Sequence, residues 1–191
     1  MQTYDIEVRP MREFASDVRR EAASVFVEGY FRELAFLSKD RERLIDAFGP
    51  MICPDVFYLA VLDRQIVGIL ACSDNRKRAL TMDRTILRKS FGFIKGNISY
   101  HVMKNEFNQQ LPYPDDTGYI ECVATAVNAR GKGVSTALFR YVMQHAPYRR
   151  YILEVTDTNT IAYRLYRKLG FSEIERKQEK FAKLKGFKER I

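Results

Sequence analysis

Two glycines and two cations occur together at Arg130-Gly131-Lys132-Gly133, directly before a run of residues with helical apolar spacing. Glycines between a strand and a helix permit backbone angles and close approaches that side chains would block. The first N–H groups of a helix have no partner inside the helix, and they lie at the positive end of its dipole, so they bind phosphate readily. The segment therefore predicts a site for a phosphate-bearing ligand. Taken alone, it is more typical of a tight turn with two solvated cations.

The spacing of these glycines argues against two common phosphate-binding loops. A P-loop needs a glycine five places before Gly131, and Ala126 occupies that position. A dinucleotide fingerprint, G-x-G-x-x-G, fits Gly131 and Gly133 but has Thr136 at its third glycine. This partial match also lies far along the chain, not in a first βαβ unit, so it is weak.

A third pattern, Q/R-x-x-G-x-G/A, accounts for the whole segment. Residues 130–135 resemble the acyl-CoA-binding motif of the GNAT N-acetyltransferases, except that Ser135 stands where that family usually has Gly or Ala. Serine is small and keeps its N–H, so we expect the loop to be retained. Downstream, NTIAYRLYRKLGF (159–171) resembles the family's second signature, N-x-x-A-x-x-x-Y-x-x-x-G-F. The two motifs occur in the family's order with one predicted strand between them, and the resemblance extends over about residues 117–173.

The resemblance implies a direct transfer of an acetyl group from acetyl-CoA to a primary amine within a ternary complex. It implies that strand backbone pairs with the pantetheine arm, that the amides of residues 131–136 hold the pyrophosphate, and that an asparagine hydrogen-bonds the cofactor arm. The residues that it places at acetyl-CoA are Val123, Ala124, Thr125, Arg130, Gly131, Lys132, Gly133, Val134, Ser135, Thr136, Asn159 and Tyr166.

Acetylation needs two proton transfers, one from the attacking amine and one to the departing thiolate. Tyr166 matches the family's general acid by the same resemblance. A tyrosine on a helix that also carries Leu165 and Leu169 would otherwise be typical of core packing.

Glu121 is the candidate general base. Strand alternation predicts that Glu121 and Val123 share one face, opposite Cys122 and Ala124. A carboxylate in the middle of a sheet is costly unless it is paired or functional. A salt bridge is an equally supported alternative for Glu121, and the resemblance also permits water as the base.

The three cysteines, Cys53, Cys72 and Cys122, are an odd number without close spacing. This pattern argues against a disulfide framework and indicates a reducing, intracellular setting. Cys122 as a nucleophile would imply an acyl-enzyme, but a small buried hydrophobe is the ordinary role of a free cysteine and is the role we expect. Because no His/Cys/Asp cluster has metal-ligand spacing, no metal is expected.

Composition limits the classes of partner. The chain has 191 residues, a net charge of +8 and a pI of about 9.4, which favours polyanionic partners in general. No apolar run approaches the roughly 18 residues that span a bilayer, so we expect a cytoplasmic protein with no membrane partner. The basic segment 76–95 leaves a nucleic-acid-binding module open, although a charge run is more often a solvated face and nucleic acid is not expected. A CoA-binding regulator without turnover and a homodimer also remain open.

The order of the elements that must position these residues predicts a mixed, sheet-centred α/β (α+β) fold. The resemblance to the GNAT family implies that the central sheet is mostly antiparallel and flanked by helices. The length fits a single GNAT-like domain over 1–191. The expected elements, in order, are a strand at 4–8, helices at 14–37 and 40–48, a hairpin of strands 56–62 and 65–72, a helical insertion at 74–116, a strand at 118–125, a helix at 134–145, a strand at 151–155, a helix at 159–169 and a last strand or two within 171–184.

The sequence does not identify the acceptor. The insertion at 74–116 is longer than the short connection usual in the resembled family. From their place in the chain order, we expect residues 14–48 and 74–116 to form the wall of the acceptor site.

Overall fold

The computed structural model describes residues 4–179 and 186–191. Its contacts divide the chain into two compact units, Met1–Tyr151 and Ile152–Ile191. The single domain expected over 1–191 stays a prediction.

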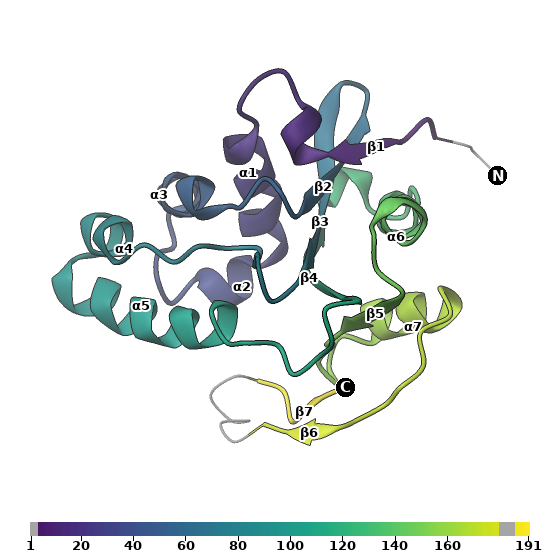
Figure 1. The fold of residues 1–191 in the computed structure, drawn as a ribbon. Helices are drawn as coiled ribbons and strands as arrows, with labels where there is room; N and C mark the ends of the chain where they lie inside the picture. The colour runs from purple at the N-terminus through teal and green to yellow at the C-terminus, as the bar shows by residue number, and fades with distance from the viewer. Residues whose placement is uncertain (1–3, 180–185) are drawn as a thin grey trace. The chain divides into compact units, whose positions relative to one another are not determined.

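A five-stranded sheet forms the centre of the fold, in the order β1-β2-β3-β4-β5 (Figure 1). The strands are β1 (Glu7–Pro10), β2 (Phe57–Leu62), β3 (Gln65–Ser73), β4 (Thr117–Thr125) and β5 (Arg150–Leu153). β1, β2, β3 and β4 pair antiparallel in succession. The predicted fold class, a mostly antiparallel sheet flanked by helices, is confirmed.

The hairpin between β2 and β3 turns at Asp63 and Arg64, as predicted. Both residues have a positive φ, 51° and 64°. Two successive positive φ values are typical of the type I′ turn, whose twist matches that of the flanking strands. The turn therefore fixes the pairing of the two strands that follow one another in the chain.

Three helices follow β1 in the chain: α1 (Arg19–Gly29), α2 (Phe31–Leu34) and α3 (Arg41–Phe48). α1 packs against β3 and β4 on one face of the sheet, and α3 packs against α1. The single helix expected at 14–37 is wrong, because the structure has two shorter helices, α1 and α2, within that range. The first of them, α1, begins only at Arg19, whose backbone N–H donates to the Asp17 carboxylate at 3.0 Å. At its other end, a Cβ on Gly29 would lie 2.6 Å from the Ala124 Cβ, so α1 needs glycine to approach β4 closely. The next helix, α3, begins as expected for the helix at 40–48, and its N-cap is Asp40, whose carboxylate accepts from the Arg43 N–H at 3.2 Å.

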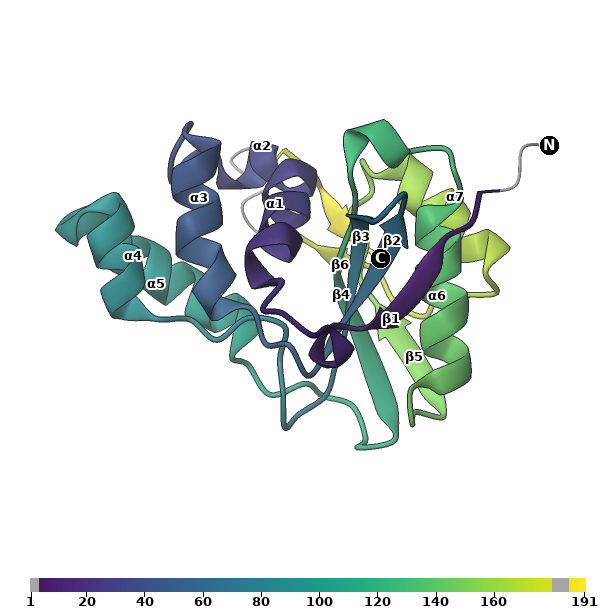
Figure 2. The same ribbon diagram turned by 90° about the horizontal axis from the view of Figure 1, so that it is seen from above.

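Helix α6 (Val134–His145) covers the other face of the sheet, as Figure 2 shows. Its buried side chains include Leu138, Phe139 and Val142. At Gly68 of β3, a Cβ would lie 2.4 Å from Cγ1 of Val134, so the strand needs glycine where α6 begins. The sheet is therefore packed on both faces, and α6 is held firmly against its centre.

The insertion before β4 forms a helical hairpin, as predicted. It contains α4 (Arg84–Phe91) and α5 (Phe93–Phe107), joined at Gly92 with a φ of 83°. Asp83 caps α4 by accepting from the N–H groups of Thr85 and Ile86 at 2.7 and 3.0 Å. A Cβ on Gly96 would lie 2.6 Å from the Arg88 Cα, so the two helices approach closely.

The second unit contains α7 (Thr160–Lys168) and a two-stranded sheet of β6 (Lys177–Gln178) and β7 (Glu189–Arg190). The strand expected within 171–184 is therefore limited to β6, and residues 180–184 of that expectation lie outside the described residues. Among the residues that the structure describes, no helix is both long and apolar enough to cross a bilayer. The same residues contain no group of three or more His, Cys, Asp or Glu side chains that could hold a metal ion.

Candidate functional site

A β-bulge interrupts β4 in its second half. Ala71 of β3 pairs with Glu121, and Ile69 pairs with Ala124, so two steps along β3 are matched by three along β4. Cys122 lies at this irregularity with a φ of 53°, a left-handed conformation that is uncommon outside glycine. Because cross-strand partners point to the same face, Glu121 and Ala124 lie on one face. The simple alternation expected for this strand, with Glu121 opposite Ala124, is therefore wrong.

The bulge also meets the junction between α1 and α2. The Tyr30 hydroxyl donates to the carbonyl oxygen of Val123 at 3.3 Å. A carbonyl oxygen has two lone pairs, so Val123 keeps capacity for a second donor. Irregular backbone in the middle of the sheet thus lies within reach of a side chain from the N-terminal helices.

The segment after β4 forms the glycine turn, residues 130–133. A 3₁₀ turn, Val127–Ala129, leads into it, and the Val127 N–H donates to Oε2 of Glu28 at 3.0 Å. Gly131 and Gly133 have φ values of 77° and 90°. A Cβ on either would meet nothing within 4 Å. These positions therefore need glycine for its backbone angle and not for space.

Helix α6 begins at the end of the glycine turn without a side-chain cap. Gly133 is its N-cap residue and supplies no capping hydrogen bond. The N–H groups of Val134, Ser135 and Thr136 belong to the first helical turn, where no intrahelical acceptor exists. The Lys132 N–H instead donates to the Ala129 carbonyl at 3.4 Å, so it belongs to the turn itself. The arrangement presents the first N–H groups of α6 and the positive end of its dipole to an anion.

The two cations of the turn have contacts of their own. Arg130 Nε donates to the carbonyl oxygen of Thr125 at 3.4 Å, which draws the side chain back toward β4. Lys132 Nζ lies 5.4 Å from the centre of the Tyr4 ring. Both cations remain close to the glycine turn and add positive charge there.

Ser135 makes a contact that the sequence did not indicate. Its Oγ lies 2.9 Å from Oγ1 of Thr125, so a hydroxyl–hydroxyl bond joins the end of β4 to the first turn of α6. Glycine or alanine at this position would lack that bond. A hydroxyl at residue 135 and a threonine ten residues earlier were visible in the sequence, but only the fold brings the two together.

Glu121 lies in a buried network of donors. Its carboxylate accepts from Arg78 Nε and Nη2 at 3.1 and 2.9 Å, from Ser73 Oγ at 2.6 Å and from the Ala79 N–H at 3.1 Å. The side chains of Arg78 and Glu121 are 13% and 10% exposed. Arg78 also donates to the Gln109 carbonyl at 2.9 Å, so the pair joins the two ends of the insertion to β4. The salt-bridge alternative is thus present, and the role of Glu121 as a base stays a prediction.

Cys122 is buried, as expected for a small hydrophobe. Burial raises the pKa of its thiol well above the usual value. Since the thiolate is the nucleophilic form, this environment disfavours nucleophilic chemistry at Cys122.

The second unit carries the other two candidates, on α7. Asn159 is the N-cap of α7, and its Oδ1 accepts from the Ala162 N–H at 3.2 Å. Tyr166 is half-buried, with its ring centre 6.1 Å from that of Phe171. Burial raises the pKa of Tyr166 to about 12. The phenol therefore keeps its proton at neutral pH.

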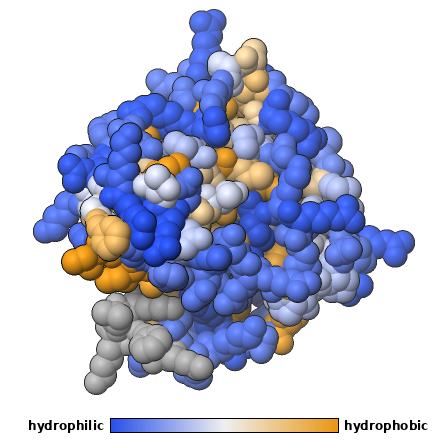
Figure 3. Space-filling model, turned by 60° about the vertical axis from the view of Figure 1, so that its left-hand side comes forward, coloured by the Kyte–Doolittle hydropathy of each residue, from blue (hydrophilic) through white to orange (hydrophobic). Residues whose placement is uncertain are grey.

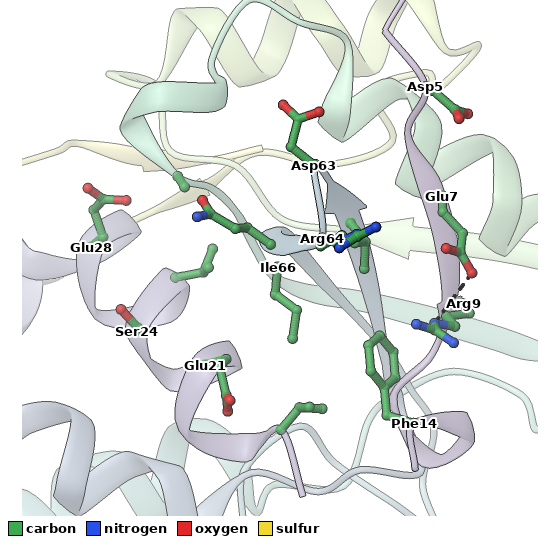
Figure 4. A pocket seen from close by; sticks show the side chains of 15 residues that line it. Asp5, Glu7, Arg9, Phe14, Glu21, Ser24, Glu28, Asp63, Arg64 and Ile66 are labelled. Atoms are coloured by element: carbon green, nitrogen blue, oxygen red, sulfur yellow. Dashed lines mark ion pairs between the residues drawn. The ribbon is translucent and has the colours of Figure 1, made fainter. Parts of the chain in front are cut away.

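The first unit also has a groove of about 860 Å³ between α1, β1 and the β2–β3 turn (Figure 4). None of the predicted site residues lines it, although Ala126, which follows directly after Thr125, does. Its floor includes Val25 and Ile66. The carboxylates around it come from three different segments: Asp5, Glu7, Glu21, Glu28 and Asp63. Arg9 and Arg64 also line the groove, so five carboxylates and two guanidinium groups leave it with an acidic balance in a protein that is basic as a whole.

Comparison with known proteins identifies the family. Residues 15–171 match the model of the acetyltransferase (GNAT) family. A search of curated proteins found no match in sequence. This chain belongs to the GNAT acetyltransferase family.

Solved structures agree with that assignment at the level of the fold. An N-acetyltransferase from Staphylococcus aureus Mu50 is 16% identical, with a TM-score of 0.61 over 96% of this chain and 97% of the other. The ribosomal-protein-S18-alanine N-acetyltransferase from Escherichia coli is 10% identical, with a TM-score of 0.54 over 97% and 90%. A GNAT-family acetyltransferase from Streptococcus pneumoniae is 15% identical, with a TM-score of 0.52 over 97% and 95%. At these identities the likeness shows the shared fold alone.

Proposed function

We propose that this protein transfers an acetyl group from acetyl-CoA to a primary amine by direct attack within a ternary complex. The observation that carries the proposal is the uncapped N-terminus of α6 behind Gly131 and Gly133, which have positive φ values. This feature falls within the residues that match the family. Acetyl transfer in general agrees with the family, whereas the primary-amine acceptor and the direct attack are our proposal.

The described residues fit a pyrophosphate at the glycine turn. The first N–H groups of α6 have no side-chain cap, and no atom lies within 4 Å of the position that a Cβ would take at either glycine. The amides of residues 131 and 133–136 would therefore hold the pyrophosphate, with Arg130 and Lys132 as nearby cations. The Lys132 amide contributes less than expected, because its N–H already has an acceptor.

The backbone of residues 123–125 would pair with the pantetheine arm, as a neighbouring strand would. The bulge at Cys122 shifts the register of β4, while Ala124 and Thr125 still pair with Ile69 and Gly68 of β3, so the pantetheine arm would pair with the backbone groups of β4 that point away from β3. The Val123 carbonyl keeps one lone pair beyond the bond from Tyr30. On the family's pattern, the Asn159 amide also bonds the cofactor arm while its oxygen caps α7.

Acetyl-CoA would supply an activated thioester, which needs little beyond positioning and a donor near its oxygen. For the departing sulfur, the family's pattern implies a general acid at Tyr166. Its raised pKa keeps it protonated, but it also makes Tyr166 a weaker acid than a thiol of ordinary pKa. We therefore assign Tyr166 as a hydrogen-bond donor that stabilises negative charge on sulfur in the transition state.

The attacking amine must lose a proton to a base. Glu121 remains the proposed protein base, with water as the alternative. All four hydrogen bonds to its carboxylate come from groups of the protein, and Arg78 supplies two of them. Oε1 accepts three of these bonds and Oε2 accepts one, so the carboxylate is largely engaged in holding the start of the insertion, which favours water as the base.

The acceptor site is proposed to use residues 14–48 and 74–116 as its wall. The groove beside α1 borders part of this wall through Phe14, Val18 and Glu28.

The free thiols of the described cysteines agree with a reducing, cytoplasmic setting for the reaction.

A thiol-release assay tests the proposal. Purified protein is incubated with acetyl-CoA and a panel of small amines, amino acids, aminoglycosides and lysine or N-terminal peptides, and free CoA is measured with a thiol reagent. The expected result is that CoA is released only when an amine is present and that the mass of that amine increases by one acetyl group. A rise in melting temperature with acetyl-CoA but no acetylated amine would favour a CoA-binding regulator. Absence of both would refute the proposal.

A further inference from the structure

The outward face of α5 is apolar, although a helix packed on one side only would carry polar residues there. Ile94, Ile98 and Val102 repeat every four residues and are 76%, 58% and 59% exposed. On the inner face of the same helix, Ser99 and Met103 are buried. Within the described part of the chain, α5 therefore has one buried face and one exposed apolar face.

Two aromatic side chains extend this surface. Phe93, the first residue of α5, is 68% exposed, and Phe36 is 56% exposed. Lys95 Nζ donates to the Leu37 carbonyl at 3.1 Å, which holds the loop that carries Phe36 beside α5. We call the set the α5 apolar patch: Phe36, Phe93, Ile94, Ile98 and Val102. Figure 3, which brings the α4–α5 side forward, shows apolar areas within a mostly hydrophilic surface.

The helical hairpin that carries most of the patch is strongly basic. Residues 84–107 contain five basic side chains and one acidic side chain, Glu106, so five minus one leaves a formal charge of +4. The Arg88 guanidinium lies 4.5 Å from the centre of the Phe93 ring, which places a cation directly against the patch. An apolar surface bordered by cations is complementary to a surface that is itself both apolar and anionic.

Charge and position favour a lipid surface over a second copy of the chain. Two copies would bring together two hairpins that each carry +4, and their repulsion would oppose the contact. Figures 1 and 2 both place α4 and α5 at the edge of the first unit, beyond α3. A projecting edge can meet a flat surface without a matching groove.

We propose that the α5 apolar patch docks onto an anionic phospholipid surface. The aliphatic and aromatic side chains enter the boundary between headgroups and acyl chains, and the flanking arginines and lysines lie at the phosphates. This binding is peripheral, because no helix among the described residues is long and apolar enough to span the bilayer. From the sequence we expected no membrane partner, because the sequence alone does not show that the outer face of α5 is exposed.

Vesicle co-sedimentation of the full-length protein tests this inference. Vesicles of phosphatidylcholine with phosphatidylglycerol are compared with vesicles of phosphatidylcholine alone. We expect binding to the anionic vesicles that weakens as salt increases. Ile94→Glu should lower the affinity by about tenfold or more, because it removes an isoleucine that enters the lipid on binding and adds a charge of the wrong sign.

Ile174→Glu is the matched control, since Ile174 is 75% exposed, against 76% for Ile94, and lies outside the patch. It should bind as the wild type does, and circular dichroism should show that both variants are folded. Wild-type protein that ignores anionic vesicles, or equal losses in both variants, would overturn the inference. A wild-type dimer in sedimentation velocity that Ile94→Glu dissociates, without vesicle binding, would assign the patch to a second copy instead. The acetyl-transfer assay is independent of all these outcomes.

Discussion

Replacing Gly133 with alanine isolates the contribution of the glycine turn. Gly133 has a φ of 90° and a ψ of 6°, and a Cβ there would meet nothing within 4 Å. Alanine therefore introduces no clash, and its only cost is that of an L-residue in the left-handed region, about 1–2 kcal/mol.

This cost lowers either the stability of the free protein or its affinity for CoA, depending on whether the turn keeps its conformation. If the free protein holds the strained angle, its free energy of unfolding falls by about 1–2 kcal/mol. If the turn instead relaxes, the first N–H groups of α6 turn away from the ligand. Binding must then restore the angle at the same cost, which weakens CoA affinity by about 5- to 30-fold. We expect this relaxation, because a surface turn opposes it with few contacts.

Gly170→Ala is the matched control. Gly170 has a φ of 96°, its Cβ position is equally open, and it lies outside the glycine turn. Isothermal titration with CoA should show an affinity loss only in Gly133→Ala, and urea unfolding should show that the stability of Gly133→Ala falls by less than the full cost of about 1–2 kcal/mol, because its turn relaxes. Unchanged affinity in Gly133→Ala, or equal losses in both variants, would refute the assignment of CoA to the N-terminus of α6.

Three further predictions concern single side chains. Ser135→Ala removes the 2.9 Å contact with Thr125 and should lower the free energy of unfolding by about 0.5–1.5 kcal/mol, while CoA affinity changes less than about twofold. Tyr166→Phe should lower kcat. Because the Tyr166 pKa is about 12, the phenol stays protonated, so kcat should show no alkaline fall due to Tyr166 up to about pH 10; a fall near pH 9 that vanishes in Tyr166→Phe would contradict this. Glu121→Gln leaves Arg78 without its counter-charge and should cost about 3–5 kcal/mol in urea unfolding; a stable variant without turnover would instead support Glu121 as the base.

Features encoded by neighbouring residues were predictable from the sequence. The Asp63-Arg64 turn, the Asp40 cap and the helical insertion all follow from turn chemistry, capping and apolar periodicity. The glycine turn belongs to this class, because positive φ values are a property of glycine itself.

Features that depend on contact between distant residues were not predictable. The bulge at Cys122 depends on how β4 pairs with β3, so the expected face of Ala124 relative to Glu121 was wrong. Glu121 and Arg78 are 43 residues apart, and nothing local indicates that they form a buried pair. Gly29 similarly interrupts a helical pattern because α1 passes close to β4.

The sequence by itself determined the family, the order of the elements and the position of the glycine turn, because each rests on short-range backbone preferences and spaced motifs. Only the tertiary structure decided which lone pairs of Glu121 are engaged, that Ser135 meets Thr125, and that the outer face of α5 is exposed. The physical reason is that hydrogen bonding and burial depend on which distant segments pack together, and local sequence does not specify that packing.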